Sequence, residues 1–164
     1  MKILQIVWHS RTGTAQQLTE ALAVAACAAA PELTVISTPA DQVSEPAMLS
    51  ADGYIFACPE NLGTMSGAMK EMVDRLYYPL LDSIAGRPCA LMIAAGTDGT
   101  GAVRQWQRII TGWRLRLVAD PIIAITGADT AEAILAPKVV AASDMERARE
   151  LGSSFATGLA LGIY

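Results

Sequence analysis

The sequence has few charged residues and a single histidine. Of its 164 residues 17% are charged, the 12 Lys and Arg residues are scattered, and the net charge is −4. Nucleic-acid binding requires a basic face, so this composition predicts no nucleic-acid partner. Because His9 is the single histidine, sites that need several imidazole ligands are excluded, and at a strand end such a residue usually has a structural role.

The sequence also lacks a cysteine framework and a long hydrophobic run. Cys27, Cys58 and Cys89 form no Cys-x-x-Cys or Cys/His cluster, which disfavours disulfides and a zinc site. The apolar N-terminal run is shorter than the core of a signal peptide, and Pro31 ends the Ala-rich stretch 21–30 before it could span a bilayer. We therefore expect a cytoplasmic protein that does not bind a membrane.

Apolar residues are abundant, at 52% of the chain, and their arrangement predicts an α/β fold. Five short apolar runs without alternation are typical of strands covered on both faces: 2–8, 33–38, 53–58, 89–95 and 121–126. Helical patterns separate these runs. The alternation predicts a doubly wound parallel sheet in a three-layer αβα arrangement, within one domain over residues 1–164. Pro121 favours an edge position for the last strand, because a missing backbone donor is tolerated there.

Apolar spacings of three and four residues mark the helices. Three such stripes lie within residues 18–29, 65–76 and 103–117. A fourth helix is predicted to start at Ser143-Asp144-Met145-Glu146, which matches a capping box. Residues 39–52 contain two prolines and a short apolar patch, which predicts a loop with a brief helix.

Residues Ser10-Arg11-Thr12-Gly13-Thr14 stand between the first predicted strand and the first predicted helix. Hydroxyl and backbone N–H groups in this position face the positive end of the helix dipole, which predicts a phosphate-binding loop. The loop lacks the lysine pattern of nucleoside-triphosphate sites and the glycine spacing of dinucleotide sites, so a single terminal phosphate is favoured. The alternative is that these residues only cap the helix.

Two further glycine-bearing loops follow the third and fourth predicted strands, at residues 59–67 and 96–101. Ligands of open parallel sheets bind outside the carboxyl ends of the strands, where the strand order reverses, so these loops and residues 10–14 should converge. The segment after the second strand, residues 39–42, has no glycine. This pattern fits one flat ligand with a phosphate tail.

The chain resembles the flavodoxin-like superfamily, and within it the small FMN-dependent NAD(P)H oxidoreductases and quinone reductases. Residues 10–14 resemble the family's phosphate loop, residues 59–75 resemble the reductase flavin loop and its helix, and Gly96-Thr97-Asp98-Gly99 resembles the loop at the pyrimidine side of the flavin. The resemblance implies the strand order 2-1-3-4-5 for the five-stranded sheet. Two features depart from the family: Ala15 replaces a hydroxyl residue, and residues 127–142 have no counterpart.

The resemblance implies FMN as the cofactor and NAD(P)H as the co-substrate, and it assigns roles to the three loops. The phosphate would be bound by Ser10, Arg11, Thr12, Gly13 and Thr14. The isoalloxazine ring would be lined by Pro59, Glu60, Asn61, Leu62, Gly63, Thr64 and Met65, with Gly96, Thr97, Asp98, Gly99 and Gly101 near its other edge.

Several of these residues allow a more specific expectation. Leu62 or Met65 would provide the apolar face that a tricyclic ring needs. The carboxylate of Asp98 would oppose the negative charge that appears on flavin reduction. Glu60 either orients the acceptor or is an ordinary solvated loop carboxylate. Cys58 ends the third strand and is expected to be a buried, inert thiol.

The implied activity is hydride transfer from NAD(P)H through FMN to a small electron acceptor such as a quinone. One alternative is a flavodoxin-type electron carrier, although carriers usually have an acidic rim and aromatic rings beside the flavin, and residues 59–67 contain no aromatic. The other is a flavodoxin-fold binding module without catalysis. Without a dinucleotide domain, the nicotinamide would stack on the exposed ring in a cleft completed by another subunit. Residues 76–81, Trp106 and Trp113 are candidates for that homo-oligomer interface.

Overall fold

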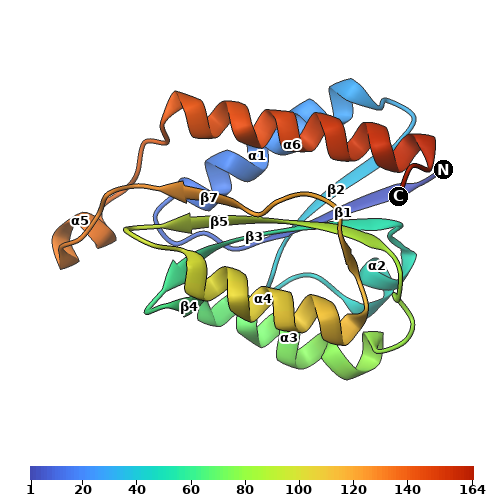
Figure 1. Cartoon of the computed structure of the whole chain (residues 1–164), viewed down its shortest axis with the longest axis horizontal. Helices are drawn as coiled ribbons and strands as arrows, with labels where there is room; N and C mark the ends of the chain where they lie inside the picture. The colour runs from blue at the N-terminus through green and yellow to red at the C-terminus, as the bar shows by residue number, and fades with distance from the viewer.

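A computed structural model describes all residues from Met1 to Tyr164 and contains a parallel sheet with helices on both faces (Figure 1). The parallel strands are β1 Ile3–Trp8, β2 Thr34–Pro39, β3 Gly53–Asn61, β5 Pro88–Ala95, β6 Arg116–Leu117 and β7 Ile122–Ile125. They lie in the order β2-β1-β3-β5, followed by an edge position that β6 and β7 share. The predicted doubly wound sheet with five strand positions in the order 2-1-3-4-5 is therefore confirmed.

The edge position is divided in two. Strand β6 pairs with the first two residues of β5 and β7 pairs with its last four, both on the side of β5 that does not face β3. Pro121 lies in the gap between them, as expected for an edge strand that tolerates a missing donor. A further strand, β4 Thr64–Met65, runs antiparallel to the end of β3. The sequence did not predict β4 or β6, because two residues show no periodicity.

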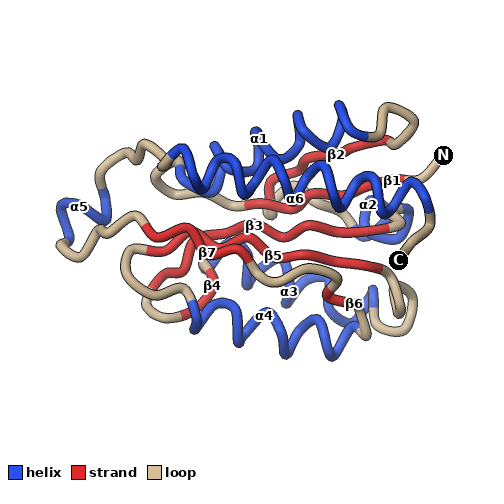
Figure 2. Tube along the Cα trace, turned by 45° about the horizontal axis from the view of Figure 1, so that its top comes forward, coloured by secondary structure: helices blue, strands red, loops and turns tan.

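The helices form two layers, which Figure 2 shows on either side of the strands. One layer contains α1 Thr14–Ala29 and α6 Ala142–Leu161, and the other contains α2 Glu45–Ser50, α3 Gly67–Leu80 and α4 Thr100–Trp113. The short helix α5 Ala131–Leu135 stands away from the sheet, beyond the carboxyl ends of the strands. None of these helices combines the length and apolar character that crossing a membrane requires.

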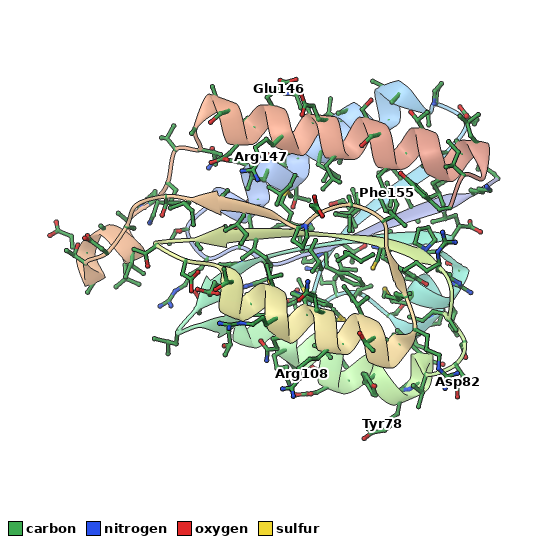
Figure 3. The ribbon with its side chains drawn as sticks, viewed as in Figure 1. Tyr78, Asp82, Arg108, Glu146, Arg147 and Phe155 are labelled. Carbon is green, nitrogen blue, oxygen red and sulfur yellow. The ribbon has the colours of Figure 1, made fainter.

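Each face of the sheet has its own hydrophobic core. Under α3 and α4, Phe56 stacks on Trp106 with ring centroids 4.5 Å apart, and Trp113 stacks on Tyr77. Under α1 and α6, Phe155 points from α6 toward the sheet, whereas Tyr78 points from α3 away from the body of the molecule (Figure 3). Burial of each large side chain contributes about 1.5–3 kcal/mol, so these two clusters hold the helices on the sheet.

Several residues that we expected at a homo-oligomer interface lie in the core instead. Trp106 and Trp113 are fully buried, and so are Leu76 and Leu80 within the segment 76–81. They cannot form a contact with another subunit, because their side chains already fill the space between the sheet and its helices. In that segment Tyr78 is the one strongly exposed large apolar side chain.

Three expected helix boundaries are also wrong. Helix α6 begins at Ala142 after Ala141, without a side-chain cap, so Ser143 lies inside the first turn and the capping box does not form. The third stripe ends at Trp113, because Arg114 adopts a left-handed conformation that starts the turn toward β6. Met65 lies in β4 ahead of α3, although its side chain is buried as a core residue would be.

Candidate functional site

The loops after β1, β3 and β5 converge on one cavity of about 330 Å³ at the carboxyl ends of the strands. This volume is within the range of ~300–1,000 Å³ that small-molecule sites occupy. Most predicted site residues line it: Ser10, Arg11, Thr12, Thr14, Pro59, Glu60, Asn61, Leu62, Gly63, Gly96 and Thr97. The predicted residues that do not line it are Gly13, Thr64, Met65, Asp98, Gly99 and Gly101. The expected convergence of the three loops is therefore observed.

Residues 10–14, the phosphate loop, bring unpaired donors to one end of the cavity. Gly13 has a positive φ of 101° and directs the chain into α1. The first helical backbone bond runs from Gln17 N to Gly13 O, so the amides of Thr14, Ala15 and Gln16 have no acceptor within the helix. Thr14 is only 5% exposed, lines the cavity, and its hydroxyl makes no hydrogen bond to the chain.

The hydroxyl groups of the phosphate loop do not cap α1. The helix has no side-chain cap, and the Ser10 hydroxyl accepts a hydrogen bond from Gly13 N at 3.2 Å, inside the loop itself. The alternative that these residues serve only as a helix cap therefore fails. Their donors remain available at the positive end of the α1 dipole, where an anion would be stabilised.

Residues 126–141, which we term the strap, form a wall of the cavity that sequence reasoning missed. Thr126, Ala128, Ile134 and Lys138 line it. The strap is attached to the phosphate loop through Lys138 N, which donates to Thr12 O at 2.9 Å. It also runs against the loop after β5, because a Cβ on Gly96 would lie 2.4 Å from Ala128 O. Only Thr126, at the carboxyl end of the last predicted strand, had a position that could have indicated a site residue.

Residues 60–65, which we term the hairpin, form the opposite wall. The strand ends pair as Glu60 with Met65 and Asn61 with Thr64. The central residues Leu62 and Gly63 both have positive φ, as a type I′ turn requires. Leucine is unfavourable in this conformation by about 1–2 kcal/mol, yet Leu62 is also fully exposed, with 103% of its reference surface accessible. Strain and exposure together at a cavity mouth are typical of a functional position.

Glu60 is not the solvated surface group that its loop position favoured. Its carboxylate oxygens accept hydrogen bonds from the amides of Gly99 and Ala102, both at 2.9 Å. These amides belong to the N-terminus of α4, so the carboxylate satisfies two orphan donors at the positive end of that helix dipole. Gly101 permits this contact, because a Cβ there would lie 2.0 Å from Gly63 O.

The remaining predicted residues of these two loops have structural contacts. Asp98 accepts hydrogen bonds from the Thr100 hydroxyl at 2.8 and 2.9 Å, on an exposed part of the loop. Thr64 is exposed and bonds within the hairpin. Met65 is buried, and its amide donates to Gln105 Oε1 at 2.8 Å. Asp98, Thr64 and Met65 therefore support the walls from outside the cavity lining.

His9 connects two of the loops at their base. Its Nδ1 shares a 2.8 Å hydrogen bond with the hydroxyl of buried Ser66, whose amide donates to Pro59 O. Burial lowers the pKa of His9 below the ordinary value of 6.5, and the nearby Asp41 carboxylate partly opposes this shift. A neutral imidazole with one defined partner has the structural role that the sequence predicts.

Cys58 and Cys89 are buried thiols, whereas Cys27 is exposed. Burial raises the pKa of Cys58 to about 11, and the side chain is completely inaccessible, which agrees with the expected inert thiol. The charged groups of the cavity are Arg11, Lys138 and Glu60. Arg11 and Lys138 stand at the phosphate-loop end and form no ion pair, whereas Glu60 is bound at the hairpin end. The cavity thus has a cationic end and a hydrogen-bonded carboxylate at the other.

The chain is similar to proteins of one family. The family model described as NADPH-dependent FMN reductase matches residues 17–130, a range that includes the hairpin and the loop after β5 and begins after the phosphate loop. No curated protein sequence matches the chain significantly.

Solved structures show the same fold at low sequence identity. The WrbA-like flavodoxin protein from Agrobacterium tumefaciens has 17% identity, covers 97% of this chain and 98% of its own, and superposes with a TM-score of 0.71. A flavodoxin from Streptococcus pneumonia TIGR4 has 18% identity over 98% of this chain and 99% of its own, with a TM-score of 0.72. The flavodiiron protein from Giardia intestinalis has 15% identity over 99% of this chain and 37% of its own, with a TM-score of 0.75.

Proposed function

This chain belongs to the NADPH-dependent FMN reductase family, and we propose that it binds FMN in the cavity and acts as an NAD(P)H oxidoreductase. The observation that carries the proposal is that Thr14, whose hydroxyl makes no hydrogen bond within the chain, lines the cavity beside the unpaired amides that begin α1. Free hydroxyl and amide donors at the positive end of a helix dipole are suited to an anion, and a phosphate monoester at this place would supply their acceptors.

The residues present fit FMN. At one end, Thr14, Thr12 and the first amides of α1 can donate to the phosphate, and Ala15 reduces this donor set by one hydroxyl. At the other end, Leu62 offers an apolar surface for the ring system. Gly96 and Thr97 also line the cavity, and their backbone amides would suit the polar edge of a flavin, which needs donors.

When bound, FMN supplies the redox chemistry, which is to take a hydride from a reduced nicotinamide and pass electrons to a small acceptor such as a quinone. The chain supplies position and environment. The phosphate loop would hold one end of the ligand, and the hairpin and strap would limit access of water to the ring. Glu60 fixes the hairpin against α4. No general base is required for hydride transfer, and the cavity lining contains no histidine.

We also propose that the nicotinamide and the acceptor use the open mouth of the cavity in turn, within a cleft completed by a second copy of the chain. Large apolar side chains are exposed on the two walls, where Leu62 and Ile134 line the cavity and Leu135 and Val139 lie beside them on the strap. Sedimentation velocity tests this part of the proposal, since a monomer at micromolar concentration would contradict it.

The decisive experiment is titration of the purified protein with FMN, followed through quenching of flavin fluorescence and the visible absorption spectrum. We expect saturable binding of one FMN per chain. Oxidation of NADPH and NADH is then measured anaerobically with and without a quinone. Turnover that depends on bound FMN supports the oxidoreductase, FMN binding without nicotinamide oxidation indicates an electron carrier, and absence of FMN binding indicates a module without this cofactor.

A further inference from the structure

We propose that Lys138 of the strap is a ligand of the flavin phosphate and makes the site selective for FMN over riboflavin. This inference rests on the proposed function, because it assigns a role within the same cavity. Lys138 lies beyond residue 130, where the family model ends, so its role follows from the contacts of this chain.

The backbone of Lys138 is held directly against the phosphate loop. Its amide donates to Thr12 O at 2.9 Å. The side-chain nitrogen of Gln17 donates to both Lys138 O at 2.9 Å and Gly13 O at 3.0 Å, so one amide group connects the strap to the loop. These contacts place Lys138 in the same cavity lining as Thr12 and Thr14.

The ammonium group retains a donor for a ligand. It donates to Ile134 O at 3.0 Å and to Ala136 O at 2.5 Å, which are carbonyls at the end of α5. An ammonium has three donors, so one remains after these bonds. No carboxylate pairs with Lys138, whereas Lys70 on α3 is paired with Asp74.

The surroundings favour a doubly charged anion at this place. Arg11 lines the same end of the cavity and also lacks an ion pair, so two positive charges are uncompensated there. A phosphate monoester carries a charge of about −1.5 to −2 at neutral pH. It would accept hydrogen bonds from the Thr14 hydroxyl, the amides of α1 and the free donor of Lys138 at once. The ammonium thereby offsets the hydroxyl that Ala15 removes from the loop.

A purely structural role for Lys138 predicts different binding results from a role as a phosphate ligand. In that case the ammonium only caps the C-terminal carbonyls of α5, and its removal loosens the strap. A loosened strap would weaken every ligand of the cavity, because Ala128 and Ile134 also line it. A phosphate ligand affects only molecules that carry the phosphate. The ratio of FMN affinity to riboflavin affinity separates the two roles.

The test compares FMN and riboflavin binding by fluorescence quenching in wild type, Lys138→Met and Lys138→Arg, with Lys70→Met as the control for loss of a surface charge. We expect Lys138→Met to weaken FMN binding about tenfold, as loss of one charge-assisted hydrogen bond predicts, with riboflavin binding unchanged. Lys138→Arg should retain most of the FMN affinity, and Lys70→Met should match the wild type. The difference between wild type and Lys138→Met should shrink as salt rises.

Two results would overturn the inference while leaving the proposed function intact. One is an equal loss of FMN and riboflavin affinity in Lys138→Met, which would show that the lysine only supports the strap. The other is unchanged FMN affinity in that variant. If the wild-type protein binds neither flavin, the proposed function fails and the role of Lys138 fails with it.

Discussion

Helices α1 and α4 begin in the same way, at the same end of the sheet, and yet their N-termini are treated differently. Each follows a glycine with positive φ, 101° at Gly13 and 88° at Gly99, and neither has a side-chain cap at that glycine. At α4, the carboxylate of Glu60 accepts from two amides. At α1, Gly13 N donates to the Ser10 hydroxyl, whereas the amides of Thr14, Ala15 and Gln16 have no partner in the chain. The hydroxyl of Thr14 has none either.

The carboxylate of Glu60 shows how an anion within the chain satisfies a helix N-terminus, and the phosphate of a ligand would do the same for α1. Two helix dipoles point their positive ends at one cavity, and the chain neutralises only one of them. The carboxylate at α4 is a permanent part of the hairpin wall, so that wall is complete before any ligand arrives. The N-terminus of α1 keeps unpaired amides that the proposed ligand would bind, and the cations Arg11 and Lys138 line the same cavity.

Replacing Glu60 should have the largest effect on stability, because the N-terminus of α4 would then lack an internal acceptor, as that of α1 does. We expect Glu60→Ala to lower the free energy of unfolding by about 3 kcal/mol, since two charge-assisted hydrogen bonds to α4 are lost. Urea unfolding of the protein without ligand measures this change. Glu71→Ala is the matched control, because its ion pair with Arg75 is exposed and is worth about 0.3–0.5 kcal/mol. Equal effects of the two variants would show that Glu60 is solvated and that the termini do not differ.

Thr14→Val tests the other terminus. Valine keeps the β-branched shape and removes the hydroxyl, so we expect FMN affinity to fall about tenfold. Stability without ligand should be unchanged, because Thr14 lines the cavity and its hydroxyl makes no hydrogen bond within the chain. Thr14→Ser, which retains the hydroxyl, should bind FMN nearly as well as the wild type. A stability loss in Thr14→Val comparable to that of Glu60→Ala would mean that the α1 terminus is also satisfied internally.

The difference between the termini also marks the limit of prediction from the sequence. The place of residues 10–14 at the cavity was predictable, since a strand, five small or polar residues and a helix follow one another directly. Their binding of a phosphate stays a prediction. The strand order followed from the apolar runs and the family resemblance. The role of Glu60 was not predictable, because its partners Gly99 and Ala102 are backbone amides that leave no side-chain pattern.

The strap shows the same limit on a larger scale. Residues 126–141 have no apolar periodicity, and Lys138 meets Thr12 only after the whole sheet has formed. The capping box failed for a related reason. Ser143 and Glu146 have the right spacing, but the start of α6 is set by where the chain returns from the strap, at Ala141. Local spacing predicts elements, whereas long-range backbone contacts decide where they begin.

Replacing Leu62 in the hairpin should change stability less than replacing Glu60, and in the opposite direction. We expect Leu62→Asn to raise the free energy of unfolding by about 0.5–1 kcal/mol, because Asn-Gly suits a type I′ turn and Leu62 is in a left-handed conformation. The same variant should weaken both FMN and riboflavin binding, since the proposed apolar contact of Leu62 is to the ring that both flavins share. Urea unfolding and flavin titration measure the two effects. A destabilised variant would show that the leucine stabilises the hairpin by itself, so that its strain needs no ligand to explain it.

The smallest effect concerns His9, which joins the two sides through Ser66. Burial lowers the pKa of His9 below 6.5 in the folded chain. Below that pH the unfolded chain binds a proton that the folded chain does not, so stability is lost as the pH falls from 6.5 toward the folded pKa. We expect His9→Gln to remove this part of the pH dependence, measured by urea unfolding between neutral and mildly acidic pH. An unchanged profile would mean that the imidazole is not held neutral by its burial, and that the link between the two walls does not depend on pH.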